Sequence, residues 1–218
     1  MSKSKIICHR GKTDIFSIGN SENSFLNSLK YGFGIETDIR DFGGKLYIAH
    51  DIPKKEPLME FERFLKIVKE NNIRGTLALN IKSSCCVPLI CNIRNELDSL
   101  DYFFFDMAIP DHIQFSKKGL VNAVRVSELE TYKESNQQIF KNQWLWIDTL
   151  NFNYGREFFR NIESNLEKGL KICIVSPELH GLETSDFVKN FKKLFIENKN
   201  LYVCTDIPKT YNDLLNIG

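Results

Sequence analysis

The chain has 218 residues, which fits one folded domain spanning residues 1–218 and is long enough to bury roughly 70% of the unfolded chain's surface. Its 29 basic and 28 acidic residues nearly cancel, which argues against nucleic-acid binding, because that function needs excess basic charge on one face. The sequence has no signal-peptide pattern and no apolar run long enough to span a membrane. We therefore expect a cytoplasmic protein, and no feature of the sequence indicates an oligomeric state.

The six cysteines are consistent with a reducing compartment. None of them forms a C-x-x-C pair of the kind found in zinc sites. Cys8, Cys173 and Cys204 lie inside apolar, strand-like segments, where a thiol behaves as a small hydrophobic side chain. We predict that these three thiols are buried and unreactive.

Short segments rich in β-branched and aromatic residues alternate along the chain with longer segments of helical periodicity. Eight such units in one domain favour a parallel (β/α)8 barrel, the TIM-barrel fold. An open doubly wound sheet is the alternative, but no Gly-rich phosphate loop follows the first strand. The predicted strands are 5–9, 34–40, 76–82, 102–106, 123–127, 144–148, 171–176 and 201–205. The predicted helices are 24–31, 58–71, 87–98, 110–118, 130–137, 157–168, 185–198 and 209–215.

The alternation of side chains along the strands predicts which residues point into the barrel. In the strand at 34–40 the apolar side chains share one face, while Glu36 and Asp38 share the other. Because the apolar face has to pack against helices, we expect both carboxylates to point inward. The same argument places Asn80 and Lys82 inside the barrel.

Two histidines are expected at the same end of the barrel as these carboxylates. His9 ends the first predicted strand, and the pair Gly43-Gly44 predicts a tight hairpin turn into a short return strand that ends at His50. Active sites of such barrels are built from polar groups at the carboxyl ends of the strands. The polar residues expected at this rim are His9, Glu36, Asp38, His50, Asn80, Lys82, Asp106, Arg125, Asp148 and Glu178.

The two carboxylates require a compensating positive charge. Glu36 and Asp38 cannot both remain ionised inside a barrel without a cation nearby. A hard divalent cation, Mg²⁺ or Ca²⁺, is one answer. A structural network with Arg40, Lys82 or Arg125 is the other.

The presence of His9 and His50 at the same rim favours a bound metal over a structural ion-pair network. A metal that grips a phosphate between two imidazoles is suited to general acid–base cleavage of a phosphodiester.

Two further residues lead to separate expectations. Arg125 lies on an inward face, where it could bind phosphate or pair with Asp148 or Glu178. His112 falls in a predicted helix, and we expect it at the surface.

Several motifs occur in a defined order along the chain, and the strongest lie within residues 5–51. They are His9-Arg10-Gly11, Glu22-Asn23-Ser24, Glu36-Thr37-Asp38 and His50-Asp51, followed by Ile81-Lys82 and Thr205-Asp206-Ile207-Pro208. In order, spacing and strand context, this set resembles the glycerophosphodiester phosphodiesterase family.

The resemblance implies a (β/α)8 barrel that cleaves a small-molecule phosphodiester with a divalent metal. It also implies that a hydroxyl next to the phosphate attacks first and gives a cyclic phosphate, which water can then open. The residue roles that it implies are acid–base catalysis by His9 and His50, phosphate binding by Arg10 and Lys82, and metal binding by Glu36 and Asp38.

The sequence departs from the family pattern at three places. Asn80 stands where the family has a glutamate that supplies a third metal ligand; its carbonyl oxygen still suits a hard cation, but one negative charge is lost. No subdomain is inserted after His50-Asp51, so the pocket should be more open. Residues 175–178 replace the tryptophan-threonine motif of the family on the seventh strand.

These departures leave two alternatives open. The protein could be a lyase that releases the cyclic phosphate, as in the related sphingomyelinase D type. It could also be a barrel that binds a phosphate ligand without turnover, an alternative motivated by Asn80 and by the missing insertion.

Overall fold

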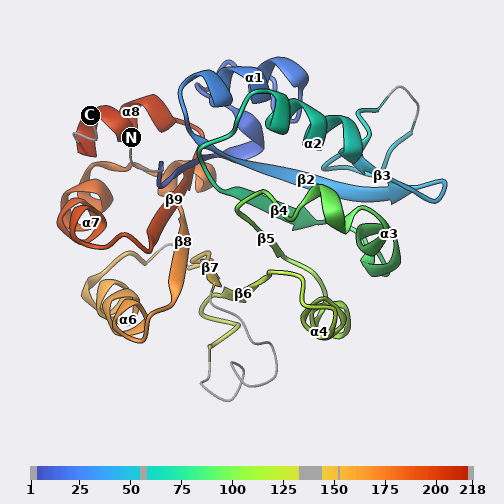
Figure 1. Cartoon of the computed structure of the whole chain (residues 1–218). Coiled ribbons are helices and arrows are strands. Elements are labelled where there is room, and N and C mark those ends of the chain that lie inside the picture. The colour runs from blue at the N-terminus through green and yellow to red at the C-terminus, as the bar shows by residue number, and fades with distance from the viewer. Residues whose placement is uncertain (1–3, 55–57, 133–143, 152, 216–218) are drawn as a thin grey trace.

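Eight parallel strands form a nearly closed barrel, and helices cover its outer surface (Figure 1). The predicted (β/α)8 fold is therefore confirmed. The computed structural model describes residues 4–54, 58–132, 144–151 and 153–215. The barrel strands are β1 (Ile6–Cys8), β2 (Gly34–Phe42), β4 (Leu77–Ile81), β5 (Tyr102–Phe105), β6 (Ala123–Val126), β7 (Trp144–Ile147), β8 (Lys171–Val175) and β9 (Leu201–Thr205). The helices are α1 (Glu22–Lys30), α2 (Phe61–Glu70), α3 (Val87–Asn92), α4 (Ile109–Lys117), α6 (Arg156–Glu167), α7 (Ser185–Glu197) and α8 (Pro208–Leu215), and the 3-10 turns are η1 (His9–Gly11), η2 (Arg94–Glu96) and η3 (Pro177–His180).

The strands follow the ring order β5-β4-β2-β1-β9-β8-β7-β6. Between β5 and β6, the described residues close the ring through an isolated bridge that pairs Phe104 with Asn122. There the amide of Phe104 donates to the carbonyl of Val121 at 2.9 Å. The ring is thus nearly closed, and it is most thinly hydrogen-bonded at this seam.

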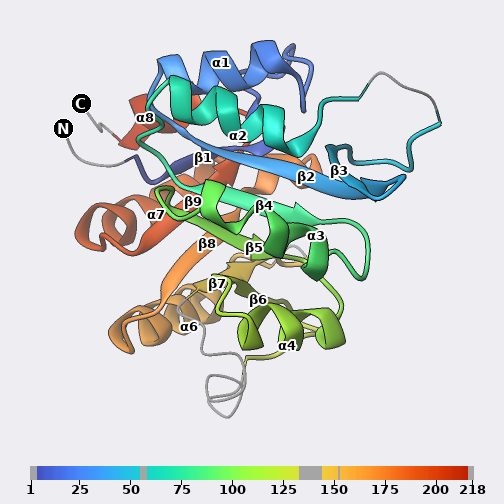
Figure 2. The ribbon, with the colours of Figure 1, turned by 45° about the vertical axis from the view of Figure 1, so that its right-hand side comes forward.

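The predicted hairpin is also confirmed. The antiparallel strand β3 (Lys45–Ile48) pairs with β2, and the hairpin that they form extends away from the ring (Figure 2). Gly43 and Gly44 make the turn with φ of 56° and 80°, values that glycine adopts without strain. The return strand ends at Ile48, two residues before His50, which therefore lies on the following loop.

The other predicted elements agree with the structure to within about three residues at each end, with two exceptions. The helix predicted at 87–98 is interrupted, because Ile93 leaves the helical region (φ −107°, ψ 14°) and separates α3 from η2. The helix predicted at 130–137 is not found at 130–132, and the rest of it lies outside the described residues. None of the described helices is both long and apolar enough to cross a membrane.

The barrel interior is filled by aromatic side chains. Phe103 stacks on Trp144 with ring centroids 4.4 Å apart, and Phe105 stacks on Trp146 at 3.9 Å. The apolar faces of the strands pack outward against the helices, as the side-chain alternation predicted. Among the described residues the barrel interior is therefore a packed core, and in such barrels the active site is built at the carboxyl ends of the strands. The three cysteines expected in the core are buried, and burial raises the pKa of the Cys8 thiol to about 12.

The expectation that His112 lies at the surface is wrong. Its side chain is buried beneath α4, where Nε2 lies 2.6 Å from the amide oxygen of Asn122. An amide oxygen only accepts hydrogen bonds, so Nε2 carries the proton. Burial lowers the pKa of His112, although the bond to Asn122 opposes this shift.

The buried His112 predicts a dependence of stability on pH. The folded protein keeps this imidazole neutral, whereas the unfolded chain takes up a proton as the pH falls through about 6.5. The free energy of unfolding should therefore decrease toward acidic pH, by at most about 1.4 kcal/mol per pH unit from this group. Urea unfolding of the wild type and of His112→Gln between pH 7.5 and 5 measures the effect. Equal slopes for the two proteins would contradict it.

Candidate active site

The first motif forms a tight turn at the carboxyl end of β1. Arg10 has φ of 52° and Gly11 has φ of 70°, so the chain reverses immediately after His9. This turn directs the amide of Arg10 to Glu36 Oε2, 2.9 Å away. A Cβ at position 11 would lie 2.6 Å from Cδ1 of Phe25. The glycine of the motif is therefore required both by the backbone conformation and by the helix packed against it.

We predict that Gly11→Ala destabilises the fold by about 2–4 kcal/mol, combining left-handed strain with overpacking. Gly32→Ala is the matched control, because Gly32 also has positive φ, at 75°, but has nothing within 4 Å of an added Cβ. That control should cost only about 1–2 kcal/mol. Chemical denaturation measures both variants. Equal losses would show that the contact with Phe25 relaxes freely.

The second motif supports the first rather than taking part in chemistry. Ser21 and Ser24 form a capping box at the start of α1, and the Ser24 hydroxyl also lies 3.3 Å from the carbonyl of Arg10. Glu22 pairs with Arg63 of α2 at 2.8 Å. These residues therefore fix the helix onto which the turn after β1 folds.

Both carboxylates of the third motif point into the barrel rim and are almost completely buried. Glu36 is 2% exposed and Asp38 is 1% exposed. Asp38 Oδ2 accepts a hydrogen bond from Asn20 Nδ2 at 2.9 Å. It also lies 3.2 Å from Nε of Arg10, an ion-pair distance at which the N–H is not aligned for a hydrogen bond.

Burial and, to a lesser extent, the neighbouring Asp38 raise the pKa of Glu36 to about 7, while His9, the Arg10 amide and Lys82 oppose the shift. A carboxyl with this pKa is only partly ionised near neutral pH. Arg10 and Lys82 pair with Asp38, as the alternative of a structural network with Lys82 anticipated in part, and a divalent cation at the carboxylates stays a prediction.

Asn80 lies directly beside Asp38, because the two residues are paired in register across β2 and β4. Its amide oxygen is buried, and no described group donates a hydrogen bond to it. A buried acceptor without a donor is costly, whereas an amide oxygen beside carboxylates matches the oxygen ligands of Mg²⁺ or Ca²⁺. The three residues therefore fit a hard cation, although the described residues contain no metal-holding group of three His, Cys, Asp or Glu side chains.

His9 is held by a residue from the opposite end of the chain. Its Nδ1 lies 2.8 Å from Asp206 Oδ1, while Lys12 donates to Asp206 Oδ2 at 2.9 Å. Burial alone would raise the pKa of Asp206, but the bonds from His9 and Lys12 outweigh it and lower that pKa. The ionised Asp206 therefore orients the ring of His9 through Nδ1 and leaves its Nε2 for another partner.

His50 has a similar arrangement on the loop after β3. Its Nδ1 lies 2.8 Å from Oδ1 of the adjacent Asp51. The loop is tied to β2, because the Ala49 amide donates to the Asp38 carbonyl at 3.0 Å and Arg40 Nε donates to the His50 carbonyl at 2.9 Å. The hydrogen bond from His50, together with its charge, lowers the pKa of Asp51. His50 is thus placed beside the carboxylate pair.

Lys82 and Arg125 both contact Asp106, which follows β5. Lys82 Nζ lies 3.5 Å from Asp38 and 3.6 Å from Asp106. The Arg125 guanidinium lies 2.6 Å from Asp106 and 2.5 Å from Glu130, so the expected pairing with Asp148 or Glu178 is wrong. Asp148 instead contacts His180 at 2.7 Å. Two carboxylates already bind the Arg125 guanidinium, so its contacts in the structure argue against phosphate binding. Phosphate binding by Arg125 stays an untested prediction.

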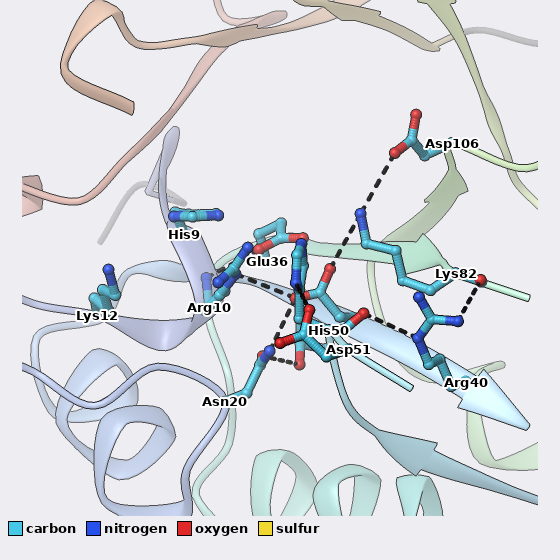
Figure 3. A network of polar contacts seen from close by, with 12 residues as sticks. His9, Arg10, Lys12, Asn20, Glu36, Arg40, His50, Asp51, Lys82 and Asp106 are labelled. Atoms are coloured by element: carbon cyan, nitrogen blue, oxygen red, sulfur yellow. Dashed lines mark hydrogen bonds and ion pairs between the residues drawn. The ribbon is translucent and has the colours of Figure 1, made fainter. Parts of the chain in front are cut away.

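The structure brings most of the predicted residues to one rim. In the view of Figure 3, Arg10, Glu36 and His50 lie between His9 and Lys82. Sequence reasoning missed Asn20 and Lys12, and it assigned no role to Asp206. Asn20 belongs to none of the motifs found in the sequence, whereas Asp206 belongs to the motif Thr205-Asp206-Ile207-Pro208 at the end of the last strand.

No protein-family model and no curated protein matches the sequence. Among solved structures, a glycerophosphodiester phosphodiesterase from Agrobacterium tumefaciens is similar with a TM-score of 0.70 and 15% identity, over 99% of this chain and 100% of its own. An Oleispira antarctica phosphodiesterase, in complex with the product sn-glycerol-3-phosphate, is similar with a TM-score of 0.74 and 12% identity, over 98% of this chain and 97% of its own. A glycerophosphoryl diester phosphodiesterase from Parabacteroides distasonis is similar with a TM-score of 0.68 and 14% identity, over 99% of this chain and 87% of its own. The chain therefore has the fold of these phosphodiesterases along nearly its whole length, as the motifs indicated.

Proposed function

We propose that the protein is a metal-dependent phosphodiesterase that cleaves a glycerophosphodiester-like substrate by general acid–base catalysis with His9 and His50. One observation carries the proposal. Two imidazoles, each contacting a carboxylate through Nδ1, lie at the same rim as the buried carboxylates of Glu36 and Asp38. The neighbour from Oleispira antarctica holds sn-glycerol-3-phosphate as its product, which supports a glycerophosphodiester as the substrate class.

Glu36, Asp38 and Asn80 would hold the divalent metal, Mg²⁺ or Ca²⁺. When bound, such an ion supplies positive charge that neutralises the carboxylates and polarises a phosphate oxygen. The buried Asn80 oxygen and the raised pKa of Glu36 are the reasons for placing it there.

Arg10 and Lys82 are the proposed phosphate-binding residues. Both are partly exposed at the rim, with side chains 30% and 20% accessible, and both also face Asp38. Their positive charges would orient the phosphate oxygens and stabilise the negative charge that develops on them during the reaction.

The proposed reaction balances protons between the two imidazoles. A substrate hydroxyl next to the phosphate forms a new bond to phosphorus, and its proton passes to Nε2 of one histidine. The bond from phosphorus to the leaving oxygen breaks, and the other histidine supplies the proton that this oxygen needs. The product is a cyclic phosphate and an alcohol. Water can then open the ring by the reverse proton transfers.

The first alternative is a lyase that stops at the cyclic phosphate. The absence of a subdomain between His50 and α2 is consistent with either outcome. Phosphorus NMR of the products separates them. Glycerol phosphate as the only final product supports hydrolysis, while a cyclic species that persists after the substrate is consumed supports the lyase.

The second alternative is a barrel that binds a phosphate ligand without turnover, which the missing third carboxylate at Asn80 would favour. Incubation with glycerophosphocholine, before and after treatment with EDTA and readdition of Mg²⁺ or Ca²⁺, distinguishes the two. Turnover that EDTA abolishes and the metal restores supports the phosphodiesterase. Binding of glycerol phosphate by calorimetry without any turnover would refute it.

A further inference from the structure

Exposed apolar side chains are concentrated at the rim that carries the candidate site. Among the described residues, the six most exposed large hydrophobic side chains all lie on segments that follow the carboxyl ends of strands. Phe16 is 88% exposed, Ile18 is 80% exposed and Ile52 is 74% exposed. The other three are Ile15, Ile109 and Leu129. Isolated exposed apolar residues are common, but this clustering at one end of a barrel calls for a physical explanation.

The loop that carries three of these residues has a defined conformation. Asp14 Oδ1 accepts hydrogen bonds from the Phe16 amide at 3.1 Å and from the Ser17 hydroxyl at 2.9 Å. The Asn20 amide donates to the Arg10 carbonyl at 2.8 Å. These polar contacts fix the loop while its apolar side chains remain in solvent, so their exposure is built into the loop.

The same loop connects two parts of the candidate site. It begins after the turn that holds His9 and Arg10, and it ends at Asn20, which bonds Asp38. On the neighbouring loop, Ile52 follows His50 by two residues. A surface that covered these apolar side chains would therefore face the mouth of the site.

We infer that this rim docks onto a phospholipid surface, and that the phosphodiester substrate is presented there as a lipid. The apolar side chains come from four separate segments, and a fluid lipid interface accepts such dispersed side chains without the contiguous complementary surface that a protein partner needs. Arg10 and Lys82 are partly exposed at the same rim, where they would meet the phosphodiester groups of such a surface while also pairing with Asp38. The identity of the substrate rests on the proposed function, whereas the docking does not.

The test uses the full chain and compares two variants. In Phe16→Ser/Ile18→Ser the apolar side chains are removed, while the fold keeps the backbone contacts of the loop. Ile196→Ser is the matched control, because Ile196 is 56% exposed but lies on α7, away from the rim. Binding is measured by co-sedimentation with vesicles of phosphatidylcholine alone and with vesicles that also contain phosphatidylglycerol.

The wild type and Ile196→Ser should bind the vesicles, and Phe16→Ser/Ile18→Ser should bind at least about tenfold more weakly. The double variant should also lose turnover of lysophosphatidylcholine in vesicles while keeping the wild-type kcat/KM for soluble glycerophosphocholine. Failure of the wild type to bind either vesicle would overturn the docking, whether or not it cleaves soluble substrates. A wild-type dimer that the double variant converts to a monomer in light scattering would assign the rim to a second copy instead. Vesicle binding without turnover of any phosphodiester would refute the proposed function and leave the docking intact.

Discussion

Replacing His9 with alanine is expected to lower kcat for glycerophosphodiester cleavage by about 10²- to 10⁴-fold, the usual contribution of a positioned general acid or base. KM should change much less, because the proposed phosphate contacts of Arg10 and Lys82 remain. His9 is partly exposed, with 22% of its side chain accessible, so its loss should leave the fold intact. Initial rates and circular dichroism of the purified variant measure both effects.

Two further variants make this result specific. His112→Gln changes a buried histidine that bonds Asn122 and has no proposed part in the reaction, so it should retain kcat even though it affects stability. Asp206→Asn keeps the size of the side chain but removes the charge that orients His9, so kcat and its pH profile should change while KM stays near the wild-type value. If His9→Ala turned over substrate as fast as His112→Gln, catalysis by His9 would be excluded.

The second large effect is expected from Asn80→Glu, which restores the carboxylate that the resemblance places at this position. A third negative charge beside Glu36 and Asp38 should tighten binding of Mg²⁺ or Ca²⁺ by at least about tenfold, because ligand charge is a main determinant of affinity in such sites. Without metal, the same charge adds repulsion in a buried cluster and should lower the midpoint of thermal unfolding. Calorimetric titration with each ion and thermal unfolding with and without metal measure the two effects.

Asn80→Ala is the control for this experiment. It removes the buried amide oxygen without adding charge, so it should weaken metal binding relative to the wild type. Because it also removes an acceptor that has no donor among the described residues, its metal-free form should not lose stability through that atom. Identical affinities of the wild type, Asn80→Glu and Asn80→Ala would place the cation elsewhere.

The sequence was sufficient to predict the fold and the direction in which the strand residues point. Strand periodicity of two is a local property, so it placed Glu36, Asp38 and Asn80 on one face before any contact was known. The register that pairs Asp38 with Asn80 is seen only in the structure, because the parallel arrangement of neighbouring strands does not by itself fix it. The match of the described strands to the predicted ones shows how strongly this pattern determines the barrel.

The contacts that the sequence did not predict depend on geometry between loops. Arg125 could reach several carboxylates from its strand, and only the positions of Asp106 and Glu130 decide its partners. Asn20 stands in a loop without periodicity, so nothing local indicates that it bonds Asp38. His112 was misplaced because a helix with one histidine on its inner face has the same local pattern as one with that histidine outside.

The hydrogen bond between His9 and Asp206 spans 197 residues of the sequence, from the end of β1 to the end of β9. During synthesis on the ribosome, His9 emerges long before its partner exists, and contacts of such long sequence separation form late in folding. A nascent or stalled chain lacking β9 would contain every motif of the first 51 residues and still leave this imidazole without its carboxylate. Under the proposed function, enzymatic activity would therefore arise only when the last strand closes the ring, so that incomplete products of translation would be inactive.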